Sequence, residues 1–395
     1  MKHYNIFLFL FTVLIATVSC TRENDINSPD TPSSDIYITD SVRYAGDKMT
    51  AYNFVYPSKD PYGNPVVLSA TITMGDSVKN NLSALGLALY NHFTIYRADE
   101  CPTKGKLDIQ RLLARSRLIT ISPDYYGFGI SEKYHQAYCI SSANAQSSVD
   151  ALLAAKKLLT GMGYKWDDRL FNLGYSQGAH TSIGVVRLVD TKYPNIHITQ
   201  TYAGAGSYDI PETYRQFISY TLAGMPSTVI SVLLAYNEYA QLGIPREEMF
   251  VEPVLSHIDE WILSKRYKRE EIDSLIGTQT LTGYIAPTLL DTNTSVSQKV
   301  ISALDNDNLC KNWTPRRDEK IYLFHNTQDI TVPVENTTNL YRYLTSMGVS
   351  GTEIDTADYG SSPLLPAHEM GAMFFMKGCV DRMSAIMGVA PWSIF

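Results

Sequence analysis

The chain has 395 residues, of which 45% are hydrophobic and 18% charged, with 24 Gly and 18 Pro. This composition is ordinary for a globular protein and excludes collagen-like, coiled-coil and disordered classes. The net charge of −7 provides no overall positive field to hold a nucleic-acid backbone. One basic cluster, Lys265 to Arg269, is followed by Glu270 and Glu271 and is interpreted as a self-paired, solvated helix face. We therefore expect no nucleic-acid partner.

The N-terminal residues have the pattern of an export signal. Lys2 precedes a mostly apolar, uncharged run, Ile6 to Val18, which is shorter than the about 20 residues that a membrane-spanning helix needs. The run ends in Thr17-Val18-Ser19-Cys20, which resembles a bacterial lipobox except that Thr17 stands where Leu is usual. We expect a signal peptide over residues 1–19 and lipidation of Cys20, with ordinary secretory cleavage as the alternative. The protein would then be exported and anchored in the cell envelope, its membrane contact made by the lipid.

The stretch 20–40 is interpreted as a tether, because Thr21 to Asp35 is rich in Ser, Thr, Asn, Asp and Pro. Four cysteines follow it: Cys101, Cys139, Cys310 and Cys379. An exported chain could pair them in three ways, and free buried thiols are an equal alternative. No two have metal-ligand spacing, so no metal site is expected.

From residue 41 onward, strand-like and helix-like patterns alternate. The first two β-rich runs flank a turn rich in Pro, Asp and Gly, which predicts an opening hairpin. The predicted strands are Thr50–Tyr56, Val66–Thr73, Leu85–Tyr90, Arg117–Ile121, Leu170–Leu173, Ile196–Tyr202, Ile321–Phe324 and Thr352–Thr356. The helices predicted between them are Ser141–Thr160 and Ala179–Tyr193. This alternation predicts an α/β fold with a mainly parallel, doubly wound sheet.

A long helical stretch, residues 207–315, interrupts the alternation. It is too long to be a structureless loop in a compact domain. Its predicted helices are Tyr214–Leu222, Thr228–Leu242, His257–Tyr267 and Glu270–Ile276. We predict a helical cap over one end of the sheet, inserted into a catalytic domain made of residues 41–206 and 316–395.

The pentapeptide Gly174-Tyr175-Ser176-Gln177-Gly178 is the strongest chemical motif. Gly-x-Ser-x-Gly is a modest signal by itself, but here it follows an apolar strand and opens a helix, the setting of a nucleophile elbow. Ser176 is the candidate nucleophile. The backbone N–H of Gln177 is expected to point toward the same space and to stabilise an oxyanion.

A serine nucleophile needs a base and an orienting acid. Asp329 follows a predicted strand, in the segment Asp329-Ile-Thr-Val332-Pro333, and His368 follows the last predicted strand. Ser176, Asp329 and His368 therefore occur in the order nucleophile, acid, base. His325 is the rival base, but it ends the same strand that precedes Asp329, and we expect it to brace the acid loop.

Together, these pieces resemble the α/β-hydrolase superfamily, and most closely its secretory lipase family of the fungal lipase-A type. The pieces are the segment Ser122 to Gly129, the elbow, the Asp-x-x-Val-Pro segment and the late histidine. The resemblance implies an α/β-hydrolase fold with a helical cap, and a second oxyanion donor in the loop after the third strand, for which we select Thr94. It also implies that Asp124 holds a loop together and is not catalytic.

We therefore predict an exported serine ester hydrolase of the lipase or carboxylesterase type, which acts through an acyl-enzyme and needs no cofactor. Its expected partners are small-molecule, lipid or glycan esters. A glycan-directed acetyl or feruloyl esterase and a serine exopeptidase on the same fold are alternatives. A non-catalytic surface-binding lipoprotein is a further one, although it would be expected to lack a member of the Ser–Asp–His set.

Overall fold

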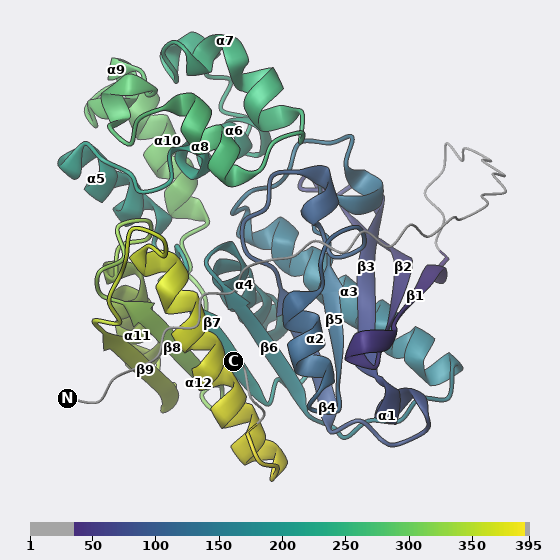
Figure 1. The fold of residues 1–395 in the computed structure, drawn as a ribbon. Coiled ribbons are helices and arrows are strands. Elements are labelled where there is room, and N and C mark those ends of the chain that lie inside the picture. Colours follow the sequence, from purple (N-terminus) through teal and green to yellow (C-terminus); the bar gives the residue numbers. More distant parts are fainter. Residues whose placement is uncertain (1–34, 392–395) are drawn as a thin grey trace, which may run out of the picture. The chain divides into compact units, whose positions relative to one another are not determined.

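A nine-stranded sheet runs through residues 35–391, the part of the chain that the computed structural model describes (Figure 1). The predicted signal segment 1–19, Cys20 and most of the predicted tether lie outside these residues. The strands are β1 (Tyr37–Tyr44), β2 (Met49–Lys59), β3 (Pro65–Gly75), β4 (Gly86–Asn91), β5 (Leu118–Pro123), β6 (Leu170–Tyr175), β7 (Gln200–Gly204), β8 (Lys320–Asn326) and β9 (Gly351–Ala357).

The order of the strands across the sheet is β1-β2-β3-β5-β4-β6-β7-β8-β9. The first three strands are antiparallel, and β3 also pairs antiparallel with β5. From β5 to β9 all neighbours are parallel. The carboxyl ends of β4, β6, β7, β8 and β9 therefore meet along one edge, where loops from distant parts of the sequence can build a site.

The sheet starts earlier than predicted. β1 includes residues 37–40, which we assigned to the tether, and it pairs with β2 from Tyr37 opposite Val55 to Tyr44 opposite Met49. Its side chains are mostly exposed, so it lacks the alternation of buried and exposed residues that reveals a strand in a sequence. β7 was also misplaced, because residues 196–199 precede the strand and only Gln200 onward pairs with β6.

Helices cover both faces of the sheet, because the buried side chains of each central strand alternate between two cores. Leu87 and Leu89 of β4 face the core that contains α3 (Ser141–Gly161), α4 (Gln177–Lys192) and α11 (Glu335–Ser346). Ala88 and Tyr90 face the opposite core. The helices of that core are α2 (Asp108–Ala114) and α12 (Ala367–Met387). The short helix α1 (Asp76–Lys79) follows β3.

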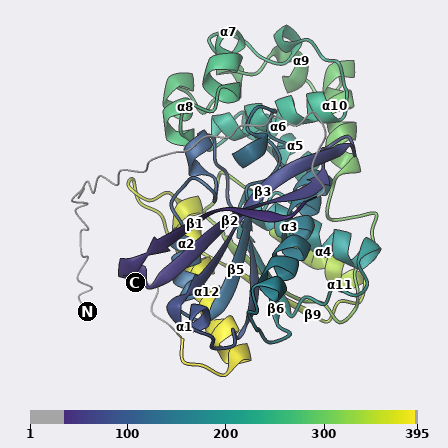
Figure 2. The same cartoon turned by 90° about the vertical axis from the view of Figure 1, so that its right-hand side faces the viewer.

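The segment predicted as a cap, residues 207–315, contains six α-helices between β7 and β8. Figures 1 and 2 show them gathered at one end of the sheet. They are α5 (Ile210–Tyr220), α6 (Pro226–Tyr239), α7 (Val254–Ile258), α8 (Arg269–Ile276), α9 (Pro287–Leu290) and α10 (Ser295–Asn306); α7 continues as a π-helix over Asp259–Leu263. Neither α9 nor α10 was predicted. We call residues 207–315 the cap.

No helix within residues 35–391 combines the length and apolarity needed to span a bilayer. The four cysteines of this region, Cys101, Cys139, Cys310 and Cys379, are all unpaired.

Candidate active site

Ser176 occupies a strained turn between β6 and α4. Its φ of 55° and ψ of −121° lie in a region that side-chain-bearing residues rarely adopt. The two flanking glycines make the turn possible. A Cβ at Gly174 would overlap the carbonyl of Gly178, and a Cβ at Gly178 would overlap the carbonyl of Asn91 at the end of β4. This is the geometry of a nucleophile elbow, which lifts the serine hydroxyl above the carboxyl edge of the sheet.

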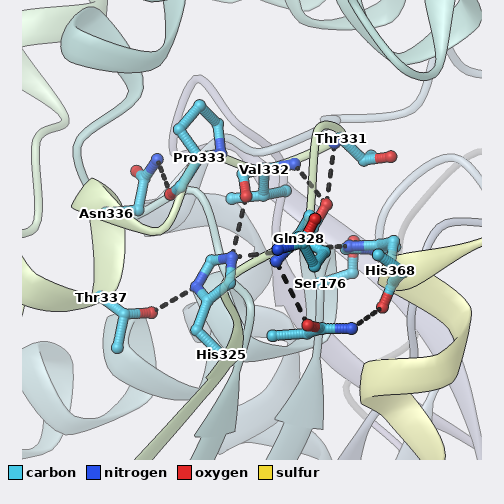
Figure 3. Close-up of polar contacts among 12 residues, drawn as sticks. Ser176, His325, Gln328, Thr331, Val332, Pro333, Asn336, Thr337 and His368 are labelled. Atoms are coloured by element: carbon cyan, nitrogen blue, oxygen red, sulfur yellow. Dashed lines mark hydrogen bonds and ion pairs between the residues drawn. The ribbon is translucent and has the colours of Figure 1, made fainter. Parts of the chain in front are cut away.

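The structure brings Ser176, His368 and Asp329 together in one hydrogen-bonded chain (Figure 3). The Oγ atom of Ser176 lies 2.9 Å from Nε2 of His368, and Nδ1 of His368 lies 2.6 Å from Oδ2 of Asp329. Since a carboxylate can only accept, Nδ1 carries the proton and Nε2 accepts from the serine hydroxyl. Ser176 follows β6, Asp329 follows β8, and His368 lies in the first turn of α12, after β9, so the fold joins positions that are 192 and 39 residues apart.

The opposite charges of Asp329 and protonated His368 shift the pKa values of both side chains. Burial of Asp329 would raise the pKa of its carboxyl, but the facing rings of His368 and His325 outweigh burial and hold that pKa below its ordinary value. Burial lowers the pKa of His368, and the Asp329 carboxylate more than reverses this, so the pKa of His368 is raised above 6.5. The other oxygen of Asp329, Oδ1, accepts the backbone N–H groups of Thr331 at 2.8 Å and Val332 at 3.0 Å. The acid is therefore held as an oriented carboxylate.

His325 lies behind the acid and makes no hydrogen bond to Ser176. Its Nε2 donates to the carbonyl of Val332 at 2.8 Å, and its Nδ1 lies 2.7 Å from Oγ1 of Thr337 (Figure 3). Its Nε2 also lies 3.5 Å from Oδ2 of Asp329. His325 thus ties the acid loop to α11, in the bracing position that we expected.

Two residues that the sequence reading missed hold the histidine loop. The hydroxyl of Tyr175 donates to the backbone carbonyl of His368 at 2.6 Å. The amide of Asn326, at the end of β8, donates to the carbonyls of Gly360 at 3.0 Å and Ala367 at 2.9 Å. Tyr175 could have been suspected from its place inside the pentapeptide, whereas Asn326 carried no such signal.

Of the two predicted oxyanion donors, Gln177 is next to Ser176 in the chain, and Thr94 shares a cavity with it. The N–H of Gln177 begins α4 and has no hydrogen-bond partner among the described residues. Thr94 lies in the loop after β4 and lines a cavity together with Ser176. A buried network joins this loop to the elbow, since the Asn91 amide donates to both Asn172 and Ser182 at 2.9 Å. The polar residues of this network were not predicted.

Two cavities open at Ser176. The first, of about 60 Å³, extends under the cap and has no charged side chain in its lining; its apolar walls include Ile210, Phe217, Val229, Val232, Leu233 and Leu304. The second, of about 250 Å³, is lined by Tyr90, Phe93, Thr94, Met225 and Phe375, and also by Glu100, Arg269, Glu270 and Glu369. Ser176 therefore borders one cavity without charged side chains and a second that is partly charged.

The charged residues of the second cavity are already engaged. Arg269 donates to Glu270 at 2.8 Å and Glu369 at 3.2 Å, while Glu100 accepts the backbone N–H groups of Tyr96 and Arg97. In residues 35–391, no group of three or more His, Cys, Asp or Glu is arranged to hold a metal ion.

Asp124 is fully buried outside the two cavities. It accepts hydrogen bonds from Ser69 Oγ at 2.5 Å, Thr103 N at 2.9 Å and Thr103 Oγ1 at 2.6 Å. Burial raises the pKa of its carboxyl to about 6. The residue joins β3, β5 and the loop that carries Thr103, in agreement with a structural role.

Comparisons with known proteins bear on the family and the fold of the chain. The family model described as secretory lipase matches residues 105–367. Among solved structures, the rice cell wall degrading esterase LipA from Xanthomonas oryzae has a TM-score of 0.73 at 17% identity, covering 90% of this chain and 98% of that chain. Lipase A from Candida antarctica, in its closed state, has a TM-score of 0.65 at 13% identity, covering 90% of this chain and 83% of that chain. These likenesses confirm the predicted α/β-hydrolase fold. No curated protein matched the chain.

Proposed function

The chain belongs to the secretory lipase family, and from this premise we propose that it hydrolyses carboxylic esters through an acyl-enzyme on Ser176. The observation that supports the proposal is the chain of hydrogen bonds from Ser176 through His368 to Asp329, built on a strained elbow. A serine hydroxyl is a weak nucleophile until a base removes its proton, and this arrangement supplies both the base and its orienting acid.

In the proposed mechanism, Oγ of Ser176 attacks the ester carbonyl carbon while its proton moves to Nε2 of His368. The electron pair of the carbonyl moves to oxygen, which accepts from Gln177 N–H and from the loop that carries Thr94. Each such donor is worth about 10²–10³ in rate. Asp329 keeps the ring in the required tautomer and stabilises the imidazolium. The imidazolium then protonates the leaving alcohol, and water repeats the sequence to release the acid.

The two cavities support an assignment of the two halves of the substrate. An uncharged, largely apolar chamber favours an acyl chain, because burying apolar surface contributes about 25 cal/mol per Å². The alcohol half would then lie in the second cavity. Three glutamates line that cavity, but Arg269 pairs with Glu270 and Glu369 and offsets part of the negative charge that an exopeptidase would present to a free amine.

A substrate panel combined with active-site labelling tests the proposal. We expect the protein to hydrolyse nitrophenyl esters, and Ser176→Ala to abolish turnover without loss of folded protein. A fluorophosphonate should label the wild type, with the adduct located on Ser176 by peptide mass spectrometry. Acetylated and feruloylated glycans and aminoacyl anilides complete the panel; preference for an anilide would contradict the ester assignment, while preference for a glycan ester would select that alcohol class.

Export and lipid anchoring at Cys20 complete the proposal. The support is the short apolar run before Thr17-Val18-Ser19-Cys20, together with membership of a secretory family. Cys20→Ala should move the protein from the membrane fraction to the soluble exported fraction. Unchanged membrane partition, or a mature N-terminus other than Cys20, would contradict the anchor.

A further inference from the structure

Two hydroxyl groups meet beside the nucleophile. Oγ1 of Thr94 lies 2.8 Å from the phenolic oxygen of Tyr138. Thr94 lines the second cavity with Ser176, whereas Tyr138 lines the first cavity with Ser176. The hydrogen bond between them therefore joins the walls of the two cavities that share Ser176 in their linings.

The direction of this hydrogen bond decides what Thr94 can do. Each hydroxyl has one hydrogen, and Oγ1 of Thr94 forms no other hydrogen bond with the described residues. The Tyr138 hydroxyl also interacts with the thiol of the adjacent Cys139, which is a weaker acceptor than Oγ1. Burial raises the pKa of Tyr138 well above its ordinary value, so its hydroxyl keeps its proton and can donate. When Tyr138 donates to Oγ1, the hydrogen of Thr94 remains available for a third atom.

The position of Tyr138 is well determined. Its side chain is buried, and its ring lies 6.5 Å from that of Tyr96, whose hydroxyl lies 2.9 Å from Ser231 Oγ of α6. The next residue is also fixed, since the hydroxyl of Tyr236 donates to the carbonyl of Cys139 at 3.0 Å. Residues of the cap thus hold Tyr138 in place, which makes its phenolic hydrogen a preorganised donor.

We propose that the side-chain hydroxyl of Thr94 donates to the oxyanion, and that Tyr138 is the positioning residue that directs this hydrogen by donating to Oγ1. The inference rests on the proposed function and specifies how the second donor works. When Oγ of Ser176 bonds to the carbonyl carbon and the π pair moves to oxygen, the new oxyanion accepts from Gln177 N–H and from Thr94 O–H. The Tyr138 proton stays on Tyr138 throughout.

A double-mutant cycle with nitrophenyl butanoate tests this inference. Thr94→Val should lower kcat by about 10²-fold, and Thr94→Ser should restore most of it, because only serine keeps the hydroxyl. Tyr138→Phe should lower kcat by about tenfold and keep KM within about twofold. The hydrogen bond that it weakens forms to the oxyanion in the transition state and not to the bound ester. In the Thr94→Val background, Tyr138→Phe should change kcat by less than about twofold, because the hydrogen that it directs is gone.

Tyr56→Phe is the matched control, since it also removes a buried phenolic hydroxyl, one that donates to the carbonyl of Ser147 at 2.9 Å, but lies outside both cavities and does not contact Tyr138. It should leave kcat unchanged while circular dichroism reports equal folding. Full kcat in Tyr138→Phe, or losses that multiply in the double variant, would overturn the role of Tyr138. Equal kcat in Thr94→Val and the wild type would overturn the donor itself, even if Tyr138→Phe proved unstable. A Ser176→Ala variant that remained active would instead reject the proposed function.

Discussion

The histidines of the site illustrate how two similar side chains acquire different tasks. His368 and His325 both approach Oδ2 of Asp329, at 2.6 Å and 3.5 Å. His368 presents its second nitrogen to Ser176, whereas both nitrogens of His325 are engaged by Val332 and Thr337. Of the two rings, only that of His368 therefore has a nitrogen that can accept the proton of Ser176.

This difference predicts that substitutions of His368, Asp329 and His325 reduce turnover by very different factors. His368→Ala should lower turnover by about 10⁶-fold, as removal of one member of a cooperating triad does. Asp329→Asn should cost about 10⁴-fold, because the amide favours the wrong tautomer. His325→Asn should retain most activity and lower the melting temperature instead. Steady-state kinetics on nitrophenyl butanoate with parallel thermal unfolding would measure this, and the opposite ranking of the two histidines would exchange their roles.

The pH dependence of the reaction should depend on Glu369. The Asp329 and Glu369 carboxylates raise the pKa of His368, while burial and Arg269 lower it. The base must be neutral to accept a proton, so activity should rise with pH through a raised histidine pKa. Glu369→Gln removes one of the raising charges and should move the acidic limb of kcat/KM to lower pH.

The matched control for this shift is Glu353→Gln, which removes an exposed carboxylate that pairs with Arg382 away from the site. Its acidic limb should coincide with that of the wild type. Identical profiles for all three proteins would show that Glu369 does not act on the base.

Helix α6 contributes the wall of the uncharged cavity, so it should control acyl length. Its residues Val229, Val232 and Leu233 line the chamber that opens at Ser176. Val232→Phe adds a ring to this wall and should reduce the space available to long acyl chains. The ratio of kcat/KM for octanoate to that for acetate should fall by about tenfold or more, since each methylene in a fitted pocket is worth about 1–3 kcal/mol.

Val296→Phe provides the comparison, because Val296 is a partly buried valine of α10 that does not line this chamber. It should leave the octanoate-to-acetate ratio unchanged. A uniform fall for all esters in Val232→Phe would indicate that the helix had shifted and that the chamber had not simply been narrowed.

A partly buried ion pair, Arg187–Asp307, is among the contacts that join the cap to the sheet domain. Asp307 accepts from Arg187 of α4 at 2.7 Å, from the N–H of Ser141 at 2.6 Å and from the hydroxyl of Tyr236 at 3.2 Å. These donors belong to the two helices under the sheet and to α6 of the cap. The same carboxylate therefore connects the cap to the helices next to the elbow.

Replacing Asp307 should lower the free energy of unfolding of the protein. Asp307→Ala leaves the guanidinium of Arg187 without its carboxylate and the N–H of Ser141 without its acceptor, at a cost of about 3 kcal/mol in the free energy of unfolding. Asp305→Ala, which removes an exposed carboxylate paired with Lys311, should cost less than about 1 kcal/mol. Urea unfolding of both variants measures the difference. Equal costs would mean that Asp307 contributes no more than a surface pair.

The sequence by itself determined the parts of this protein whose cause is local. The elbow was predicted because its requirement for glycine on both sides of Ser176 acts within five residues. The long helix α3 was predicted because apolar residues recur at helical spacing, and the order of Ser176, Asp329 and His368 follows from the order of the strands. These signals depend on the backbone near each residue and on chain order, both of which a sequence contains.

Only the tertiary structure shows the features that depend on contacts between residues far apart in the sequence. β1 is a strand because β2 pairs with it, although its own side chains are mostly exposed. Tyr175, Asn326 and Tyr138 form hydrogen bonds with residues 193, 41 and 44 positions away in the sequence. The two cavities exist only where the cap meets the carboxyl edge of the sheet. A hydrogen bond needs two groups within about 3 Å, and only the folded chain sets that distance for residues so far apart in sequence.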